Sequence, residues 1–424
     1  MKIEILTVLF TLACVHQVKL ARILGVFPIP SLSHQVVFRK ITQELHKRGH
    51  ELTVLTPDPA YPKGKAPANY TEIDFHDVSY KLFRSNIHSN YKIEGLTFTY
   101  DLLRDMNPLF MKVIEYHFQS KEVQEIVANN KYDLILLESI VLSGLIYSHI
   151  FKAPVILVSS FGGYINEHKI MGTPTSPILY PLPLRNKIYN LNFFEKIREI
   201  YRHYSNEYAE YLNDLDNDIL LKERFGPQTP TINELSENIH MLFLNVHTIW
   251  ADHKPSTPNI VYMGGIHQVP PKDLPKDLET YLNSSKHGVI YVSFGTNALS
   301  YMIPSDKIEN VVKVLSKLPY DVLWKWDRDE LPGKTDNIRL SKWFPQSDLL
   351  RHPNIKLFIT QAGLQSTDEA ITGGVPLVAI PMFGDQWYNA EKYEKFGIGI
   401  QLDITSFTEE ELHNAVITVI NDES

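Results

Sequence analysis

Short apolar runs alternate with amphipathic helical stretches along almost the whole chain. This alternation is typical of parallel β-sheets that are covered by helices. The strands predicted in the first half are RILGVFPIP (22–30), HELTVLTP (50–57), YDLILLE (132–138), APVILVSS (153–160) and HMLFLNVH (240–247). Those predicted in the second half are GVIYVSFG (288–295), DVLWKW (321–326), NIRL (337–340), KLFIT (356–360) and PLVAIP (376–381). The order of elements therefore predicts an α/β fold with two doubly wound halves.

Helices are expected between these strands. Ser33 is expected to cap a helix over 34–48, which ends before Gly49. Further helices are predicted at about 305–318, 363–372 and 385–395. Residues 165–235 are rich in tyrosine and are also predicted to be helical, although their place in the fold does not follow from the pattern.

The best candidate for a domain boundary is the Pro-rich, polar region around 250–275. We predict two domains, 22–255 and 256–424, because 424 residues are long for one domain and comfortable for two. In doubly wound sheets, ligands bind at the carboxyl ends of the strands. We therefore expect a crevice between the two halves.

Residues 1–21, MKIEILTVLFTLACVHQVKLA, are predicted to be a secretory signal peptide. A buried first strand is the alternative. The single cysteine, Cys14, lies inside this segment, so the mature protein would hold no disulfide. Sequons at Asn69 and Asn283 fit a lumenal route. The apolar segment 133–151 is interrupted by Glu138, and we interpret it as a buried strand followed by a helix.

The net charge of −8 and the pI of about 6.1 argue against nucleic acid or an anionic membrane as the main partner. No G-x-G-x-x-G turn follows a predicted strand, which argues against a nicotinamide-dependent oxidoreductase with the same layout.

Polar residues follow the predicted strand KLFIT. Gln361-Ala362-Gly363 leads into a helix whose unpaired N–H groups and positive dipole end favour phosphate. Gly363 allows close backbone approach, Ser366 adds a hydroxyl and Glu369 suits sugar hydroxyls. Each feature alone is explained by ordinary helix capping. Together they indicate a cradle for a charged, hydroxyl-rich ligand.

Two other strand ends carry similar groups. After PLVAIP, Asp385-Gln386 stands at a helix start, where a carboxylate beside an amide can bind vicinal hydroxyls. The strand GVIYVSFG ends at Ser293, Gly295 and Thr296, where backbone amides can meet phosphate, or where the chain simply turns.

Trp343, in the segment LSKWFPQSDLL, stands next to a proline loop that contains Gln346. Such a tryptophan can stack on a base, which contributes about 1–3 kcal/mol, while the glutamine reaches a ribose. A core tryptophan ahead of a capped helix is the alternative.

At this point the sequence closely resembles the UDP-glycosyltransferases. Residues 358–386, FITQAGLQSTDEAITGGVPLVAIPMFGDQ, match the signature of that family position by position. WFPQSDLLRHP, VIYVSFGT, VYMGGI and the early segment PSLSHQVVFRKITQELHKRGHELTVLTP also resemble family landmarks. The resemblance covers nearly all of 22–420. It implies a GT-B fold, in which two Rossmann-like domains, for the acceptor and for the UDP-sugar, face a central cleft.

The resemblance implies a role for each of these polar residues. Trp343 would stack on uracil, Phe344 would offer backbone contacts, and Gln346 and Glu369 would hold the ribose. The diphosphate would be surrounded by Ser293, Gly295, Thr296, Gly363 and Ser366.

Asp385 and Gln386 would hold the transferred sugar. Gln361 is a departure, because most vertebrate and plant members have histidine there. Arthropod members often carry glutamine at this position, so we interpret Gln361 as a feature of lineage that can still donate to phosphate.

The resemblance assigns the chemistry to His34. A neutral imidazole would remove the proton of the acceptor hydroxyl as that oxygen attacks the anomeric carbon. Glu138, at the end of YDLILLE, matches the family's usual aspartate and would orient the ring. Asp133 should lie at the wrong end of that strand. On residue type alone, a lone histidine is more often structural.

We expect no metal and no cofactor. The UDP-sugar would be a co-substrate. Helix-end amides can stabilise the leaving UDP in place of a divalent ion. The Asp-x-Asp pairs at Asp327/Asp329 and Asp214/Asp216 lie in polar stretches away from the landmarks and are not predicted to bind metal.

The sequence therefore predicts inverting transfer of a hexosyl group, glucose favoured, to a hydroxyl of a small lipophilic acceptor. The purpose would be detoxification or conjugation of a pigment or hormone. A UDP-sugar-binding protein without turnover is the alternative, and a homo-oligomer stays open. Family members act in the endoplasmic reticulum lumen, and their usual membrane anchor follows the point at which this chain ends, VITVINDES.

Overall fold

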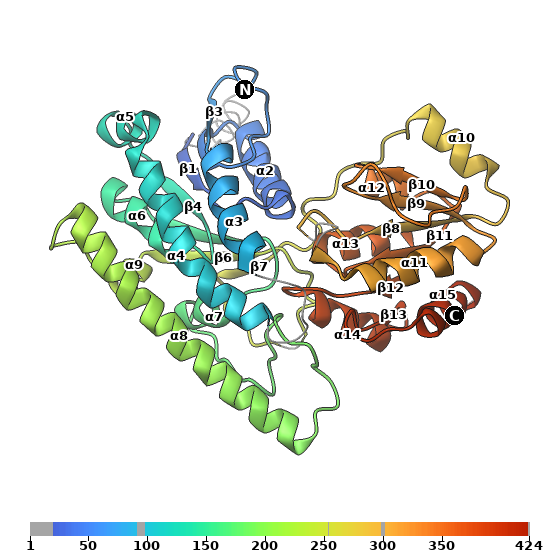
Figure 1. Ribbon diagram of the computed structural model, residues 1–424. Helices are drawn as coiled ribbons and strands as arrows, with labels where there is room; N and C mark the ends of the chain where they lie inside the picture. Colours follow the sequence, from blue (N-terminus) through green and yellow to red (C-terminus); the bar gives the residue numbers. More distant parts are fainter. Residues whose placement is uncertain (1–19, 91–97, 253, 298–301, 423–424) are drawn as a thin grey trace, which may run out of the picture.

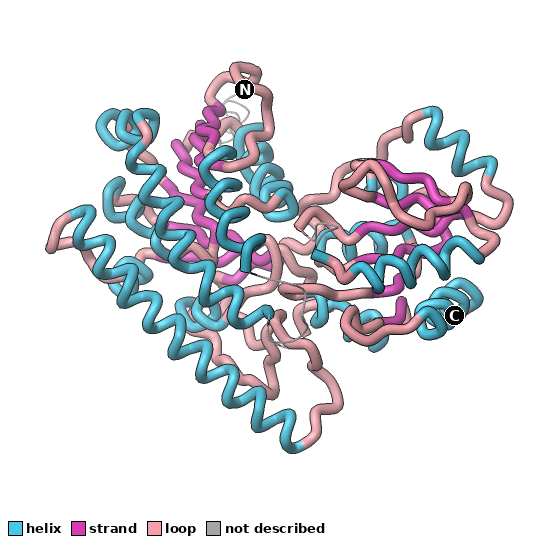
Figure 2. The backbone as a smooth tube through the Cα atoms, in the orientation of Figure 1, coloured by secondary structure: helices cyan, strands magenta, loops and turns pink. Residues whose placement is uncertain are grey.

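The computed structural model describes residues 20–90, 98–252, 254–297 and 302–422. They form two α/β lobes that lie side by side, one built on a seven-stranded sheet and the other on a six-stranded sheet (Figure 1). Figure 2 shows the strands of each lobe at its centre with helices around them. The predicted two-lobed α/β architecture is confirmed.

The first sheet is entirely parallel, in the order β3-β2-β1-β4-β5-β6-β7. Its strands are β1 (Arg22–Val26), β2 (Glu51–Thr56), β3 (Tyr70–Asp74), β4 (Leu134–Glu138), β5 (Val155–Ser159), β6 (Ile239–Leu244) and β7 (Ile260–Tyr262). The chain winds outward from β1 to β3 and then returns to β4, on the other side of β1. This reversal creates a switch point between β1 and β4, where doubly wound sheets bind ligands.

The second sheet repeats this plan in the order β10-β9-β8-β11-β12-β13, also parallel, with its reversal between β8 and β11. Its strands are β8 (Val289–Ser293), β9 (Asp321–Lys325), β10 (Ile338–Ser341), β11 (Ile355–Thr360), β12 (Leu377–Ala379) and β13 (Gly399–Gln401). The central strands β8 and β11 are almost wholly buried because helices cover both faces of the sheet.

The helices of the first lobe are α2 (Leu32–Lys47), α3 (His76–Asn90), α4 (Phe98–Gln119), α5 (Lys121–Asn129), the 3-10 helix η1 (Leu142–Leu145), α6 (Ile146–Phe151), α7 (Ile165–Ile170), α8 (Phe193–Phe225) and α9 (Ile232–Ser236). Those of the second lobe are α10 (Lys276–Ser284), α11 (Ser305–Lys317), α12 (Gln346–Leu349), α13 (Leu364–Gly373), α14 (Gln386–Phe396) and α15 (Glu409–Asn421). The tyrosine-rich region predicted to be helical contains α8, which runs along the outer edge of the first lobe (Figure 1).

The start of α2 differs from the prediction. The helix begins at Leu32, and its N-cap residue is Ser31 in an extended conformation, not Ser33. The reason is that the carbonyl of Ser31 already accepts the backbone N–H of Gln35 at 3.0 Å, which is the first helical hydrogen bond. His34 therefore lies within the first turn of the helix and not at its cap.

Strands β3, β7 and β13 were not predicted. Each of them is an edge strand of its sheet and is only partly buried, so none of them needs a continuous apolar run. Strand β7 lies beyond residue 255, the predicted end of the first domain, yet it pairs with β6 in the first sheet. The segment 133–151 forms β4, η1 and α6, as its pattern predicts. Among the described residues, none of the helices has the length and apolar character that a membrane span requires.

Candidate functional site

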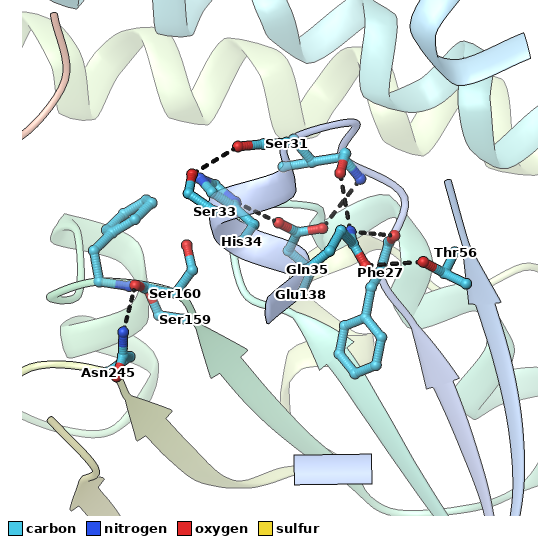
Figure 3. A network of polar contacts seen from close by, with 12 residues as sticks. Phe27, Ser31, Ser33, His34, Gln35, Thr56, Glu138, Ser159, Ser160 and Asn245 are labelled. Atoms are coloured by element: carbon cyan, nitrogen blue, oxygen red, sulfur yellow. Dashed lines mark hydrogen bonds and ion pairs between the residues drawn. The ribbon is translucent and has the colours of Figure 1, made fainter. Parts of the chain in front are cut away.

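His34 and Glu138 meet at the switch point of the first sheet. The helix α2 starts just after β1 and carries His34, while Glu138 is the last residue of the neighbouring strand β4. The imidazole Nδ1 lies 2.8 Å from Glu138 Oε1 (Figure 3). If Glu138 accepts the hydrogen of Nδ1–H, the neutral ring has its lone pair on Nε2, where it can take a proton from a ligand.

Glu138 is held on both of its oxygens. Its Oε2 accepts the backbone N–H of Ile29 at 3.1 Å, and the side chain is 2 % exposed. Burial raises the pKa of Glu138 above its ordinary value, while the hydrogen bond from His34 acts in the opposite direction. Asp133, at the start of β4, instead accepts the backbone N–H of Arg22 at the other end of the sheet.

Gln35 fixes the loop that precedes His34. Its buried amide donates to the carbonyls of Phe27 at 3.1 Å and Ile29 at 3.0 Å, and its Oε1 accepts the hydroxyl of Thr56 at 2.9 Å (Figure 3). The amide of Gln35 therefore ties the β1–α2 connection to the end of β2. Gln35 was not identified from the sequence. Its position next to the apolar face of the predicted helix could have indicated a buried polar side chain.

Aromatic rings surround the imidazole of His34. Phe161 lies edge-on to it, with ring centroids 5.4 Å apart, and Phe38 contacts it at 6.4 Å. The side chain of His34 is still 16 % exposed. One side of the ring is thus packed while part of it stays accessible to a substrate.

In the second lobe, Gln346 joins three polar side chains. Its Nε2 donates to Glu369 Oε2 at 2.7 Å and to Ser366 Oγ at 2.9 Å, and its Oε1 accepts the hydroxyl of Tyr291 at 3.1 Å. The first turns of α12 and α13 are therefore tied to β8. Burial raises the pKa of Glu369, and the hydrogen bond from Gln346 lowers it. This cluster places the carboxylate of Glu369 and the hydroxyl of Ser366 side by side, near the carboxyl ends of β8 and β11.

The turn after β8 lies against Gln361. A Cβ placed on Gly295 would lie 2.1 Å from Gln361 Nε2, and one on Gly363 would lie 3.2 Å from the same atom. Gly295 also has a φ of +77°, which favours glycine. The buried Ser293 and the half-buried Thr296 flank this turn. The amide of Gln361 therefore occupies the space that a side chain at Gly295 would need.

Trp343 lies at the rim of this region and is 60 % exposed, so its ring is available for stacking. Phe344, next to it, is buried with its ring edge-on to Tyr291. The ammonium of Lys325 lies 5.4 Å from the centre of the Trp343 ring and donates to the carbonyl of Gly295. Burial lowers the pKa of Lys325. Lys325, at the carboxyl end of β9, was not predicted to belong to the site. A lysine at the end of an otherwise apolar strand could have indicated it.

Asp385 is the N-cap residue of α14 and is held by Asn389 from the next turn. Asn389 Nδ2 donates to Asp385 Oδ2 and to the carbonyl of Ala362, both at 2.9 Å, and its Oδ1 accepts the indole N–H of Trp250 at 2.8 Å. Burial raises the pKa of Asp385 to about 6. Gln386 Oε1 accepts the backbone N–H groups of Met382 and Phe383 at 2.8 and 2.9 Å, so this amide shapes the turn before the helix. Asn389 was also missed in the sequence.

The two lobes touch beside the His34–Glu138 pair. Asn297 Nδ2 donates to Ser31 Oγ at 3.1 Å, and Gln365 Nε2 donates to the carbonyl of Ser160 at 2.9 Å. A cavity of about 20 Å³ lies between the lobes, with Gly162 of the first lobe and Asp385 of the second lobe in its wall. The strand ends that carry the first-lobe pair and those that carry the second-lobe cluster therefore face the same interface.

The Asp-x-Asp pairs lie elsewhere. Asp329 is exposed and pairs with Lys342 at 2.8 Å, while Asp214 and Asp216 are on α8 at the outer edge of the first lobe. Within the described ranges, no group of three or more His, Cys, Asp or Glu side chains is arranged to hold a metal ion.

Comparison with known proteins identifies relatives that match most of this chain. The model of the family described as UDP-glucoronosyl and UDP-glucosyl transferase matches residues 22–424. An ecdysteroid UDP-glucosyltransferase of Lymantria dispar multicapsid nuclear polyhedrosis virus is 34% identical over 428 residues, covering 98% of this chain and 83% of that protein. A UDP-glycosyltransferase of Dactylopius coccus is 30% identical over 412 residues, covering 94% and 76%.

Solved structures show the same fold. The glycotransferase of kitacinnamycin superposes with a TM-score of 0.59 at 19% identity, covering 95% of this chain and 91% of that chain. An Arabidopsis thaliana protein complexed with UDP-L-rhamnose superposes with a TM-score of 0.57 at 16% identity, covering 96% and 91%. These neighbours have the GT-B arrangement of two facing lobes.

Proposed function

The chain belongs to the UDP-glucoronosyl and UDP-glucosyl transferase family and is a UDP-glycosyltransferase, and from that premise we propose an inverting, metal-independent transfer. The sugar is a hexose, with glucose favoured, and the acceptor is a hydroxyl of a small lipophilic molecule. The lobe built on the seven-stranded sheet binds the acceptor, and the lobe built on the six-stranded sheet binds the UDP-sugar. The observation that carries this proposal is the 2.8 Å contact between His34 and Glu138 at the lobe interface.

His34 Nε2 accepts the proton of the acceptor hydroxyl while that oxygen forms a bond to the anomeric carbon. The bond from the anomeric carbon to the phosphate oxygen breaks on the opposite side, and UDP leaves with the electron pair. Glu138 holds the ring and stabilises the imidazolium that results. The product has the opposite anomeric configuration, because a single displacement inverts the carbon.

The leaving diphosphate is stabilised by the turn at Gly295, the amide of Gln361 and the start of α13. Trp343 stacks on uracil, Glu369 and Gln346 bind ribose, and Asp385 with Gln386 binds the sugar. The hydrogen bond from Lys325 to the Gly295 carbonyl supports this placement, because it puts a cation beside the same turn. No step requires a divalent ion.

The preference for glucose and for a hormone-like acceptor rests on the relatives. Several proteins that are similar over most of this chain are named ecdysteroid UDP-glucosyltransferases. An ecdysteroid therefore belongs in the acceptor screen together with simple phenols. The screen uses UDP-glucose, UDP-glucuronate and UDP-N-acetylglucosamine as donors. Faster turnover with a donor other than UDP-glucose would overturn the glucose assignment.

His34→Ala tests the mechanism. Loss of a general base typically costs about 10²–10⁴-fold in kcat, with little change in the KM for UDP-sugar. His240→Ala is the matched control, because His240 is exposed on β6 in the same lobe. Transfer at full rate by His34→Ala would refute the assignment. Tight UDP-sugar binding with no transfer to any acceptor by the natural chain would favour the alternative, a binding protein without turnover.

Trp343→Ala tests the donor site separately. Loss of base stacking should weaken UDP binding by roughly tenfold or more, measured by calorimetry. An unchanged dissociation constant would remove the stacking role and leave the role of His34 intact.

A secretory compartment is the proposed location. Both sequon asparagines, Asn69 and Asn283, are exposed and accessible to a glycosylating enzyme. Expression of the full chain in insect cells should give a product whose mass falls after treatment with a glycosidase that removes N-linked sugars. The double variant Asn69→Gln, Asn283→Gln should show no such fall in mass. A natural chain whose mass is also unchanged by the glycosidase would argue against this route.

A further inference from the structure

Asp385 is held by a side chain that is itself held by the other lobe. Asn389 Nδ2 donates to Asp385 Oδ2 at 2.9 Å, and Asn389 Oδ1 accepts the indole N–H of Trp250 at 2.8 Å. Among the described residues, no other side chain donates to Asp385. Trp250 lies between β6 and β7, so it is part of the first lobe. One amide therefore connects the carboxylate of the second lobe to the first lobe.

The amide of Asn389 can face in only one direction. An indole N–H can only donate, so the atom of the amide that faces Trp250 is the oxygen. The carbonyl of Ala362 can only accept, so the atom that faces it, at 2.9 Å, is the nitrogen. A flipped amide would place a donor against the indole N–H and an acceptor against the carbonyl. Trp250 and Ala362 together therefore direct the N–H groups of Asn389 towards Asp385.

The position of the indole is fixed by apolar packing. Asp385, Asn389, Tyr393 and Phe396 are four, four and three residues apart, so they follow one face of α14. The ring of Trp250 stacks on Phe396 with ring centroids 5.6 Å apart, and it lies 6.2 Å from the ring of Tyr393. Figure 1 shows α14 on the side of the second lobe that faces the first. The indole thus lies on the same helix face that carries Asn389 and Asp385.

Asn389 also favours the charged form of Asp385. Burial raises the pKa of Asp385 to about 6, and the hydrogen bond from Asn389 lowers it because an N–H donor stabilises a carboxylate. The charge of a protonated His34 lowers the same pKa, so the imidazole is near this carboxylate. An ionised carboxylate accepts sugar hydroxyls more strongly than a neutral acid does. Asn389 therefore influences both the direction and the charge of a group beside the catalytic pair.

We propose that Asn389 is a positioning residue for the transferred sugar and that Trp250, through its indole N–H, makes the first lobe contribute to the affinity for that sugar. Both residues act through Asp385. The role rests on the proposed function, in which Asp385 binds the sugar of the donor. UDP alone carries no sugar, so the ratio of the dissociation constants of UDP and UDP-glucose reports on this role.

Trp250→Phe tests the link between the lobes, because it removes the N–H and keeps an aromatic ring on α14. Calorimetry without acceptor measures the binding of UDP and of UDP-glucose. Loss of this hydrogen bond should weaken UDP-glucose binding by about threefold to tenfold and change UDP binding by less than about twofold. A purely structural role of Trp250 would weaken both ligands alike, and that result would overturn the proposal.

Asn389→Asp tests the amide. The variant keeps the shape of the side chain and an acceptor for Trp250, but it places an oxygen in front of Asp385 in place of an N–H. UDP-glucose binding should weaken by about tenfold or more relative to UDP, because a hydrogen bond to a charged group is lost. An unchanged ratio of the two dissociation constants would refute the positioning role.

Tyr388→Phe is the matched control. The hydroxyl of Tyr388 donates to Asp252 Oδ2 at 2.7 Å, so this change also removes one hydrogen bond between α14 and the first lobe, but it leaves Asn389 and its partners in place. The ratio of the dissociation constants should stay that of the natural chain. If Tyr388→Phe lowers the ratio as much as Trp250→Phe does, lobe contact in general determines sugar affinity, and the proposal is wrong.

Asp385→Asn separates this role from the proposed function. If Asp385→Asn leaves the ratio unchanged, the sugar-binding role of Asp385 fails and the positioning role fails with it. If Asp385→Asn lowers the ratio while Trp250→Phe and Asn389→Asp do not, only the positioning role fails. Far-ultraviolet circular dichroism and UDP binding show that each variant is folded. Should Asn389→Asp not fold, Trp250→Phe decides.

Discussion

Replacing Asp385 by asparagine should stabilise the fold while it weakens transfer. Burial raises the pKa of Asp385 from 3.8 to about 6, and the hydrogen bond from Asn389 offsets only part of that effect. Each unit of pKa difference corresponds to about 1.4 kcal/mol, so an ionised Asp385 costs the folded state up to about 3 kcal/mol. This figure is a ceiling, because the residue keeps some contact with solvent that screens its charge.

The effect of pH on this cost has a definite sign. Because the folded state binds the proton more tightly than the unfolded chain, the cost is absent below pH 3.8 and complete above about pH 6. Asparagine carries no charge, and its amide oxygen can still accept the Asn389 hydrogen bond. The variant should therefore exceed the natural chain in unfolding free energy by at most roughly 3 kcal/mol at pH 8 and by roughly half of that at pH 5.

Urea unfolding followed by tryptophan fluorescence between pH 5 and pH 8 measures this difference. Asp336→Asn is the control, because Asp336 is an exposed aspartate of the same lobe. Its stability should change by less than about 0.5 kcal/mol. A less stable Asp385→Asn variant at pH 8, or a gap of equal size at both pH values, would refute the reasoning. Transfer by Asp385→Asn should fall, since an amide accepts sugar hydroxyls less well than a carboxylate does.

Gly295→Ala should destabilise the second lobe and weaken UDP binding, since its Cβ would meet the Gln361 amide at 2.1 Å. Gly384→Ala is the comparison: its φ of +67° carries similar backbone strain, about 1–3 kcal/mol, but no atom lies within 4 Å of the new Cβ. A larger loss for Gly384→Ala would contradict the steric argument. Adding Gln361→Ala to Gly295→Ala should restore part of the stability, as measured by thermal unfolding. Lys392→Met should cost about 3 kcal/mol, because it breaks the 2.7 Å ion pair with the partly buried Asp252. Unfolding in urea checks this, and a neutral effect would show that the pair is dispensable.

Several residues of the candidate site in the second lobe could be predicted from the sequence to lie near one another, because they are local. Gln346, Gly363, Ser366, Glu369 and Asp385 follow strands at helix starts within one short segment of chain. The period of apolar residues reveals such strands and helices, and the carboxyl ends of parallel strands share one edge of a sheet. Residues that share a strand end are therefore neighbours as soon as the fold class is known.

Three of the edge strands, β3, β7 and β13, were not predictable in the same way. Strands β3 and β13 are only partly buried, so they need no continuous run of apolar residues. Strand β7 has only three residues and follows a Pro-rich stretch. Their pairing is decided by the strand already in place beside them, and propensity has little influence on it.

The sequence by itself determined two doubly wound sheets and the polar residues at their strand ends. Both follow from short stretches of sequence, because the spacing of apolar residues indicates strands and helices and the residue types between them indicate turns. The contact between Glu138 and His34, across 104 positions of chain, was predicted through the family resemblance and is present in the structure. Only the tertiary structure decided that Lys325 lies over Trp343 and that Asn389 connects Asp385 to Trp250 of the other lobe. Such contacts depend on the path of the whole chain in space. The residues around a polar side chain do not indicate which distant residue will form a hydrogen bond with it.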